Sequence, residues 1–212
     1  MSATCRPGLA DSWRNLSRGS GIHPVALSGA LASIRGVLEP SAKRAPSLGQ
    51  RLAELLALRR EDLVVGLGAG AFSLCLALLE QTPLRYQMVV ADGSSERLDA
   101  LVSTPSVRPV RMSPVEFARF PSQWDKIVLH DAVVSRDGAE LDGLLRLLSL
   151  RLRPAGRIAA VLCEPPRPRP AALQRSIAVA SRVRVSGFEV GLDAVVRPEG
   201  CWGLVVGAKR KA

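Results

Sequence analysis

Three glycines at alternate positions, Gly66, Gly68 and Gly70, separate a short apolar run from a longer apolar segment. Residues 63–66 have the length and composition of a buried strand, and residues 71–80 are apolar enough for a buried helix. A strand that turns through glycines into a helix allows close approach of whatever lies above the turn, whether a ligand or a neighbouring element. This feature favours a fold built of β-α steps.

Short apolar runs alternate with longer amphipathic segments along the rest of the chain, as expected of a parallel sheet with helical connections. Ser47 is placed to cap the first helix, and the turn Pro198-Glu-Gly200 joins two late strands. We therefore predict a Rossmann-like, doubly wound α/β fold with a mostly parallel seven-stranded sheet and a C-terminal antiparallel hairpin. The predicted strands are 63–66, 87–91, 107–111, 124–129, 157–163, 188–196 and 202–208, and the predicted helices are 48–58, 71–80, 95–103, 139–152 and 171–183.

The N-terminal segment differs in composition from the rest of the chain. The first 44 residues are rich in Ser, Gly, Arg and Pro and poor in acidic residues, like an organellar transit peptide. We predict an irregular basic N-terminal arm over residues 1–46 and one domain over residues 47–212. The apolar runs are all shorter than the roughly 20 residues that a membrane-spanning helix needs, so we expect a soluble protein without a membrane span.

The four cysteines, Cys5, Cys75, Cys163 and Cys201, are scattered along the chain and form no CxxC pair. This spacing predicts neither a metal site nor a disulfide framework. It favours free buried thiols in a reducing compartment. Together with the N-terminal composition, it predicts an intracellular protein, located in the cytoplasm or in a mitochondrial or other organellar matrix.

The charge of the chain is positive and unevenly distributed. The formal net charge is +10, and residues 146–212 carry 13 basic and four acidic side chains. A basic C-terminal section and a basic N-terminal arm suggest an anionic neighbour, such as RNA, an acidic protein or a lipid headgroup. Arginine outnumbers lysine 25 to 4, which suits bidentate phosphate contacts. Codon bias toward arginine is an equally good explanation of this composition.

Asp92 ends the second predicted strand, roughly 20 residues after the glycine turn, where a carboxylate can accept both hydroxyls of a ribose. A dinucleotide-binding turn usually reads GxGxxG. In this chain Phe72 and Ser73 come two and three residues after Gly70, so that pattern is not met. A nicotinamide-dependent reductase is therefore only the third alternative. A nucleoside-binding site of another kind is favoured.

Five segments, in this order, resemble the class I S-adenosylmethionine-dependent methyltransferases, in particular the broad type 11 group. They are QRLAELLALRREDLVVGLGAG, MVVADGSSERLDAL, WDKIVLHDAVV, LDGLLRLLSLRLRPAGRIAAVL and SGFEV with the later GLVVGAKR. The resemblance extends over about residues 48–208, which is most of the chain. It implies the fold predicted above, S-adenosylmethionine as the cofactor and methyl transfer as the activity.

The resemblance also implies roles for individual residues. Glycines 66, 68 and 70 would line the methionine end of the cofactor, Asp92 would hold its ribose, and Ser113 would flank its adenine. His130 and Asp131 would lie at the rim facing the substrate as the catalytic candidates, with His130 available as a general base. The implied cofactor-binding set is Gly66, Gly68, Gly70, Asp92, Gly93 and Ser113.

Three positions depart from the family pattern. Gly66 stands where the family usually has an acidic residue, Phe72 stands at its third glycine, and Ser113 stands at its adenine-side acid. Two hypotheses follow. The first is an S-adenosylmethionine-dependent methyltransferase whose acceptor is a small molecule or a protein side chain. The second is a pseudoenzyme, a catalytically inactive structural subunit of a larger assembly. In one form of this hypothesis the assembly is organellar and contains RNA.

Overall fold

The computed structural model describes residues 46–68, 70–94, 105–164, 170–197 and 200–209. The chain divides into two units, Met1–Pro40 and Ser41–Ala212, and every described residue belongs to the second. The predicted N-terminal arm lies outside the described residues except for Pro46, so the division at residue 46 stays a prediction. The predicted helix over residues 95–103 also lies outside them.

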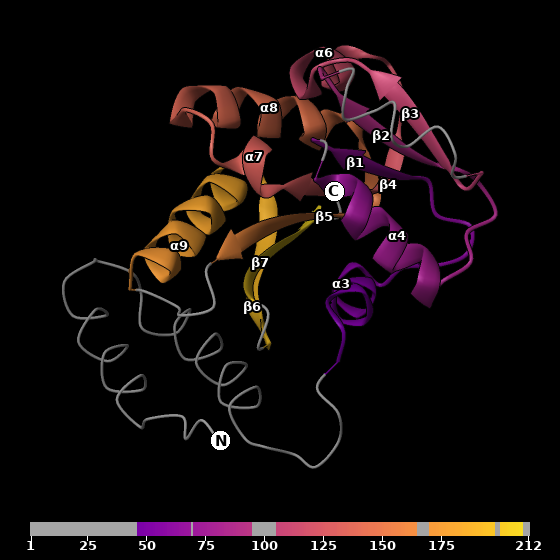
Figure 1. Cartoon of the computed structure of the whole chain (residues 1–212). Coiled ribbons are helices and arrows are strands. Elements are labelled where there is room, and N and C mark those ends of the chain that lie inside the picture. Colours follow the sequence, from indigo (N-terminus) through magenta and orange to yellow (C-terminus); the bar gives the residue numbers. More distant parts are fainter. Residues whose placement is uncertain (1–45, 69, 95–104, 165–169, 198–199, 210–212) are drawn as a thin grey trace, which may run out of the picture. The chain divides into compact units, whose positions relative to one another are not determined.

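A seven-stranded sheet with the order β3-β2-β1-β4-β5-β7-β6 forms the centre of the second unit (Figure 1). The pairs along β3-β2-β1-β4-β5 are parallel, whereas β7 runs antiparallel to both of its neighbours. The predicted fold class, a mostly parallel sheet with a C-terminal antiparallel hairpin, is confirmed. The strands are β1 (Val64–Leu67), β2 (Met88–Asp92), β3 (Val107–Arg111), β4 (Trp124–His130), β5 (Leu152–Glu164), β6 (Phe188–Arg197) and β7 (Gly200–Lys209).

The strand order reverses between β1 and β4. From β1 the chain builds outward through β2 to β3, and it then returns to the other side of β1 with β4. The connections on the two sides of this point diverge, which leaves room at the carboxyl ends of the two strands. The reversal therefore fixes the place where a ligand site is expected.

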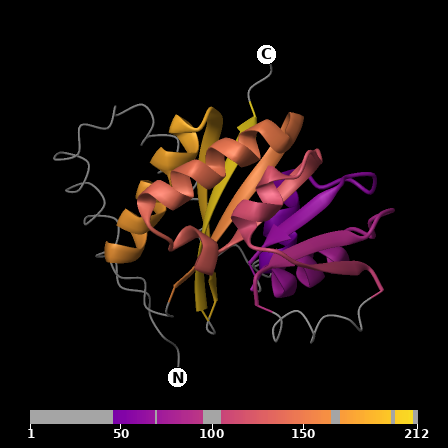
Figure 2. The same cartoon turned by 90° about the horizontal axis from the view of Figure 1, so that it is seen from above.

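Helices cover both faces of the sheet (Figures 1 and 2). Helices α3 and α4 pack on one face, and their apolar residues form one core cluster with one side of the strands. Helices α6, α7, α8 and α9 contribute to a second cluster on the other face. The helices are α3 (Leu48–Leu56), α4 (Ala71–Gln81), α6 (Pro114–Arg119), α7 (Asp131–Val134), α8 (Gly138–Arg151) and α9 (Pro170–Val185).

The first helix begins as predicted. The Ser47 hydroxyl accepts a hydrogen bond from the Gln50 N–H at 3.0 Å, which satisfies one of the free donors of the first turn of α3. The helix ends at Leu56 rather than at residue 58, because Ala57 adopts a left-handed conformation with a φ of 48°.

Two short helices, α6 and α7, were not predicted. The sequence Ser113-Pro114-Val115-Glu116 is a capping-box signature, and the structure shows both hydrogen bonds of that motif. Helix α7 has four residues, too few for a hydrophobic period to identify it. The segment 154–156, predicted to separate a helix from a strand, lies inside β5. The register of β5 against β4 shifts there, and Ala155 takes a φ of 62°.

A buried ion pair lies near the amino ends of β1 and β4, away from the strand ends where a ligand is expected. Lys126 and Asp62 are 6% and 8% exposed, and Lys126 Nζ lies 3.6 Å from Asp62 Oδ2. Burial lowers the pKa of Lys126 below its ordinary value, and the Asp62 carboxylate opposes that effect. Asp62 also accepts the Arg59 N–H at 2.7 Å, so its carboxylate holds the turn that leads into β1.

Candidate functional site

The carboxyl ends of the central parallel strands carry the predicted site residues. Gly68 follows β1, Asp92 ends β2 and His130 ends β4, on both sides of the point where the strand order reverses. Ligands of open α/β sheets bind outside such strand ends, so this edge is the candidate functional site. The other predicted residues at this edge, or in the strands that lead to it, are Gly66, Gly70, Gly93, Ser113 and Asp131.

Gly68 makes the turn from β1 into α4. Its φ of 92° lies in the left-handed region that favours glycine. Its N–H donates to the Ala91 carbonyl oxygen at 2.9 Å, and its own carbonyl accepts the Ala71 N–H at 2.9 Å. These bonds join the end of β1 to β2 and to the first turn of α4. The eleven-residue helix α4 thus begins at the candidate site, where its N-terminus favours a negative charge or a polar acceptor.

The other two glycines are required by close packing within the protein. A Cβ at Gly66 would lie 2.8 Å from Cys75 Sγ and 3.0 Å from the Ala71 Cβ, so α4 packs directly on the strand there. A Cβ at Gly70 would lie 2.2 Å from both Cε1 and Nε2 of His130. The 2.8 Å and 2.2 Å distances are shorter than the contacts that real Cβ atoms make. The glycine at each position is therefore explained without a ligand.

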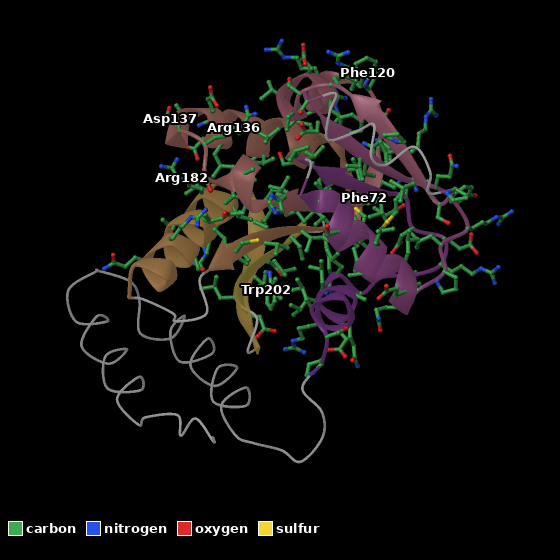
Figure 3. All side chains as sticks on the ribbon, in the orientation of Figure 1. Phe72, Phe120, Arg136, Asp137, Arg182 and Trp202 are labelled. Atoms are coloured by element: carbon green, nitrogen blue, oxygen red, sulfur yellow. The ribbon has the colours of Figure 1, made fainter. Side chains whose placement is uncertain are left out.

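Phe72 packs against the protein core. Its partly buried side chain contacts the core cluster that α3 and α4 form on one face of the sheet (Figure 3). This packing accounts for the large side chain at the position of the family's third glycine.

Asp92, Gly93 and Ser113 lie together at the ends of β2 and β3. One oxygen of the Asp92 carboxylate accepts the Ser94 N–H at 2.7 Å, and the Asp92 carbonyl accepts the Met112 N–H at 3.0 Å. Among the described residues, a Cβ added at Gly93 would meet only the Ser113 Cα, at 4.0 Å. No described side chain therefore fills the position over Gly93, which is next in sequence to Asp92.

Ser113 has a structural task as the N-cap of α6. Its hydroxyl accepts the Glu116 N–H at 3.3 Å, and the Glu116 carboxylate accepts the Ser113 N–H at 2.9 Å. Hydrogen bonding to Ser113 lowers the pKa of Glu116. The reciprocal pair fixes the loop after β3, and with it the backbone that faces Gly93. The implied contact of Ser113 with an adenine ring stays a prediction.

His130 caps the short helix α7 and packs inward over the glycine turn. Its Nδ1 accepts the Ala132 N–H at 3.3 Å. Nε2 lies 3.8 Å from Sγ of Cys163, at the end of the neighbouring strand β5. In this orientation the lone pair of Nδ1 is used by the cap, and the catalytic role implied for His130 stays a prediction.

Asp131 is the first residue of α7 and is held by a cation from α9. Arg175 Nη2 donates hydrogen bonds to Asp131 Oδ1 and to the Ser135 hydroxyl. Ser135 in turn donates to the Asp131 carbonyl at 2.6 Å. The carboxylate of Asp131 is thus fixed between α7 and α9 at the rim of the site, beside His130 in sequence.

The sequence did not identify Cys163 and Arg175 as members of this region. Cys163 follows the apolar run of the fifth predicted strand, so its position at the same sheet edge was accessible from the strand pattern. Arg175 lies in the middle of a helix rich in basic residues, and nothing in the sequence separates it from them. Its pairing with Asp131 depends on how α9 packs against the rest of the fold.

We expect iodoacetamide at pH 8 to label Cys163 of the folded protein and to leave Cys75 unmodified. Cys163 is exposed, whereas Cys75 is buried between α4 and β1, and burial raises the pKa of its thiol to about 12. Only the thiolate reacts with iodoacetamide, so Cys75 should react only after the protein is unfolded in urea. Peptide mass spectrometry separates the two sites. Equal labelling of both in the folded protein would contradict the packing of α4 on β1.

Two further properties concern the described part of the chain. Among the described residues, His, Cys, Asp and Glu form no group of three or more that is able to hold a metal ion. In the same part of the chain, no helix is long and apolar enough to cross a membrane.

The fold was compared with known proteins. No known family model and no curated protein sequence matches the chain. Solved structures do match: the [4+2]-cyclase SpnF has a TM-score of 0.60 at 13% identity, over 78% of this chain and 80% of SpnF. The S-adenosylmethionine-dependent methyltransferase SibL has a TM-score of 0.58 at 21% identity, over 76% of this chain and 55% of SibL. The pyocyanin biosynthetic protein PhzM has a TM-score of 0.56 at 20% identity, over 76% of this chain.

The chain has the class I S-adenosylmethionine-dependent methyltransferase fold. It spans about half of the length of PhzM and SibL, 53% and 55% respectively. Identities this low establish the fold alone. Because SpnF is a [4+2]-cyclase, the same fold also carries a chemistry other than methyl transfer. The activity of this chain therefore depends on the residues of its own site.

Proposed function

We propose that the chain is an S-adenosylmethionine-dependent methyltransferase whose acceptor is a small molecule or a protein side chain. The observation that carries this proposal is the carboxylate of Asp92 at the end of β2, beside Gly93 and next to the strand reversal. A carboxylate in that position suits the two hydroxyls of a ribose. The fold shared with SibL supports the same class of cofactor.

The residues fit such a cofactor better at its nucleoside end than at its amino-acid end. Asp92 would accept hydrogen bonds from the ribose, and the backbone of Gly93 and Ser113 would face the base. The turn at Gly68 and the N-terminus of α4 would face the remainder of the cofactor. No side chain replaces the family's acidic residue at Gly66, because α4 occupies that direction.

The cofactor, when bound, supplies an activated methyl group, and the protein supplies alignment and exclusion of water. Asp131, held by Arg175 and Ser135, would orient a polar acceptor at the rim. His130 would act on an acceptor proton only after its ring gives up the bond from the Ala132 N–H. Acceptors that need no deprotonation fit the observed ring orientation best.

A second candidate function, a non-catalytic structural subunit, is favoured by one observation. The His130 ring already fills the space against Gly70, and α4 already fills the space beside Gly66. An anionic partner such as RNA would then bind through basic side chains. Arg153, Arg175 and Arg182 are engaged by carboxylates inside the domain, so the proposed contact would rest on other basic residues.

Calorimetric titration with S-adenosylmethionine and S-adenosylhomocysteine tests the first candidate. We expect binding that Asp92→Asn weakens ten- to a hundredfold, because a hydrogen bond to a charged group is worth about 1.5–3 kcal/mol. Asp137→Asn is the matched control, since this exposed carboxylate precedes α8 and makes no capping hydrogen bond (Figure 3). It should leave both affinities within about twofold of the wild-type values.

Either of two results would count against the proposal. Equal affinity of the wild type and Asp92→Asn would remove the ribose role of Asp92. Absence of heat and of any thermal shift with millimolar ligand would remove the methyltransferase proposal for the isolated chain. The structural-subunit candidate would then be favoured.

A further inference from the structure

The imidazole of His130 occupies one side of the glycine turn. Its Cε1 and Nε2 are both 2.2 Å from the position of a Cβ built on Gly70, and its Cβ is 3.6 Å from one built on Gly68. The ring therefore packs against the backbone of the turn. Any group that extends from a nucleoside at Asp92 across this turn needs the space that the ring fills.

The nucleoside end of the same edge has fewer near neighbours among the described residues. Of these residues, Ser113 alone comes within 4 Å of a Cβ built on Gly93, through its Cα at 4.0 Å. The two halves of the site thus differ. A substituent that crosses Gly70 must displace the His130 ring, whereas no described side chain fills the corresponding position over Gly93.

Two of the contacts that orient the ring are long. The hydrogen bond from the Ala132 N–H to Nδ1 is 3.3 Å long, and the separation of Nε2 from Cys163 Sγ is 3.8 Å. Both lie at the long end of the range for their type, so each contributes little. His130 is also a partly exposed residue at a strand end.

We propose that His130 is a specificity-determining residue that selects against the amino-acid tail of an adenosine ligand. The observed ring position admits an adenosine thioether without a tail, and S-adenosylmethionine or S-adenosylhomocysteine binds only after the ring leaves Gly70. The inference rests on the proposed nucleoside site at Asp92. It adds that His130 sets the preference between ligands that share the nucleoside and differ in the tail.

Two thioethers provide a direct test. S-adenosylhomocysteine and 5′-methylthioadenosine share the adenosine and the sulfur, and they differ in the amino-acid tail. We expect His130→Asn to bind S-adenosylhomocysteine about tenfold more tightly than the wild type does, and to leave the affinity for 5′-methylthioadenosine within about twofold. Asparagine still caps α7, so the variant keeps the helix start while it removes the ring.

His130→Phe is the matched control, because it keeps a ring of similar size and loses both nitrogens. It should retain the wild-type ratio of the two dissociation constants, which separates the steric effect of the ring from its hydrogen bonds. If Phe and Asn change the ratio equally, the space over Gly70 is not what selects the ligand.

Nuclear magnetic resonance of the histidine side chains gives a second readout that does not depend on affinity. The chain has two histidines, and His130→Asn identifies the signals of the one at the site. We expect S-adenosylhomocysteine to shift the His130 ring signals of the wild type, and saturating 5′-methylthioadenosine to leave them nearly unchanged.

The outcomes separate this inference from the proposed function. If Asp92→Asn weakens both thioethers but His130→Asn leaves their ratio unchanged and the His130 signals do not move, the inference is overturned and the nucleoside site stands. If neither thioether binds any of the variants, both the inference and the proposed function fail.

Discussion

Replacing Lys126 with methionine is expected to lower the free energy of unfolding by about 3 kcal/mol, the lower end of the range for breaking a buried ion pair. The methionine fills most of the volume of the lysine stem, so the loss comes mainly from the Asp62 carboxylate left without its cation. Asp62 retains the Arg59 N–H, and the original N–O separation is 3.6 Å, so the effect stays at the lower end.

Urea denaturation followed by circular dichroism measures this loss. Arg85→Gln is the matched control, because Arg85 pairs with Glu61 on the surface, where the two side chains are 64% and 61% exposed. That change should cost less than about 0.5 kcal/mol. The double variant Lys126→Met with Asp62→Asn should recover most of the stability, since the uncompensated charge is then gone. A loss as small as that of Arg85→Gln would show that solvent reaches the pair.

The parts of the fold that follow from local pattern were predicted correctly. The run 63–66 and the glycines after it indicated β1 and the start of α4, and the leucine stripe of residues 139–152 indicated α8. The mostly parallel sheet followed from the alternation of such runs, and the final hairpin followed from the turn Pro198-Glu-Gly200. These features depend on hydrophobic period and on turn chemistry, which a single sequence contains.

The roles within the site were less accessible to sequence analysis. Gly70 was expected to make room for a ligand, but the structure shows that it also makes room for the ring of His130. Phe72 stands at the position of the family's third glycine, and its partly buried ring packs against the core. Each result depends on a contact between segments far apart in the chain, and one sequence without relatives gives no information on such pairs.

Arg175 shows the same limit for charge. The basic C-terminal section suggested a surface for an anionic partner, yet Arg175 binds Asp131 and Arg182 binds Asp142 within the domain. Net charge counts residues and does not show which of them are already paired. The family resemblance implied a place for Asp131 at the rim of the site, but the cation that fixes its carboxylate comes from a helix more than 40 residues later.

Gly66→Asp is expected to destabilise the protein by about 3–5 kcal/mol and to leave cofactor affinity no tighter, although it restores the acidic residue that the resembled family has there. The first atom of the new side chain would lie 2.8 Å from Cys75 Sγ and 3.0 Å from the Ala71 Cβ. Overpacking of this kind costs about 1–3 kcal/mol, and burial of an unpaired carboxyl group adds to it. Thermal and urea unfolding measure the loss.

A double-variant cycle identifies the cause of that loss. Gly66→Ala alone should cost about 1–3 kcal/mol, and its cost should fall by about 1 kcal/mol or more in a Cys75→Ala background, because the Sγ atom that it meets is then absent. A stable Gly66→Asp protein that binds S-adenosylmethionine more tightly would mean that the carboxylate reaches the ligand side of β1. The opposite result means that α4 and Cys75 fix glycine at position 66, and any tight binding must then come from the nucleoside end at Asp92.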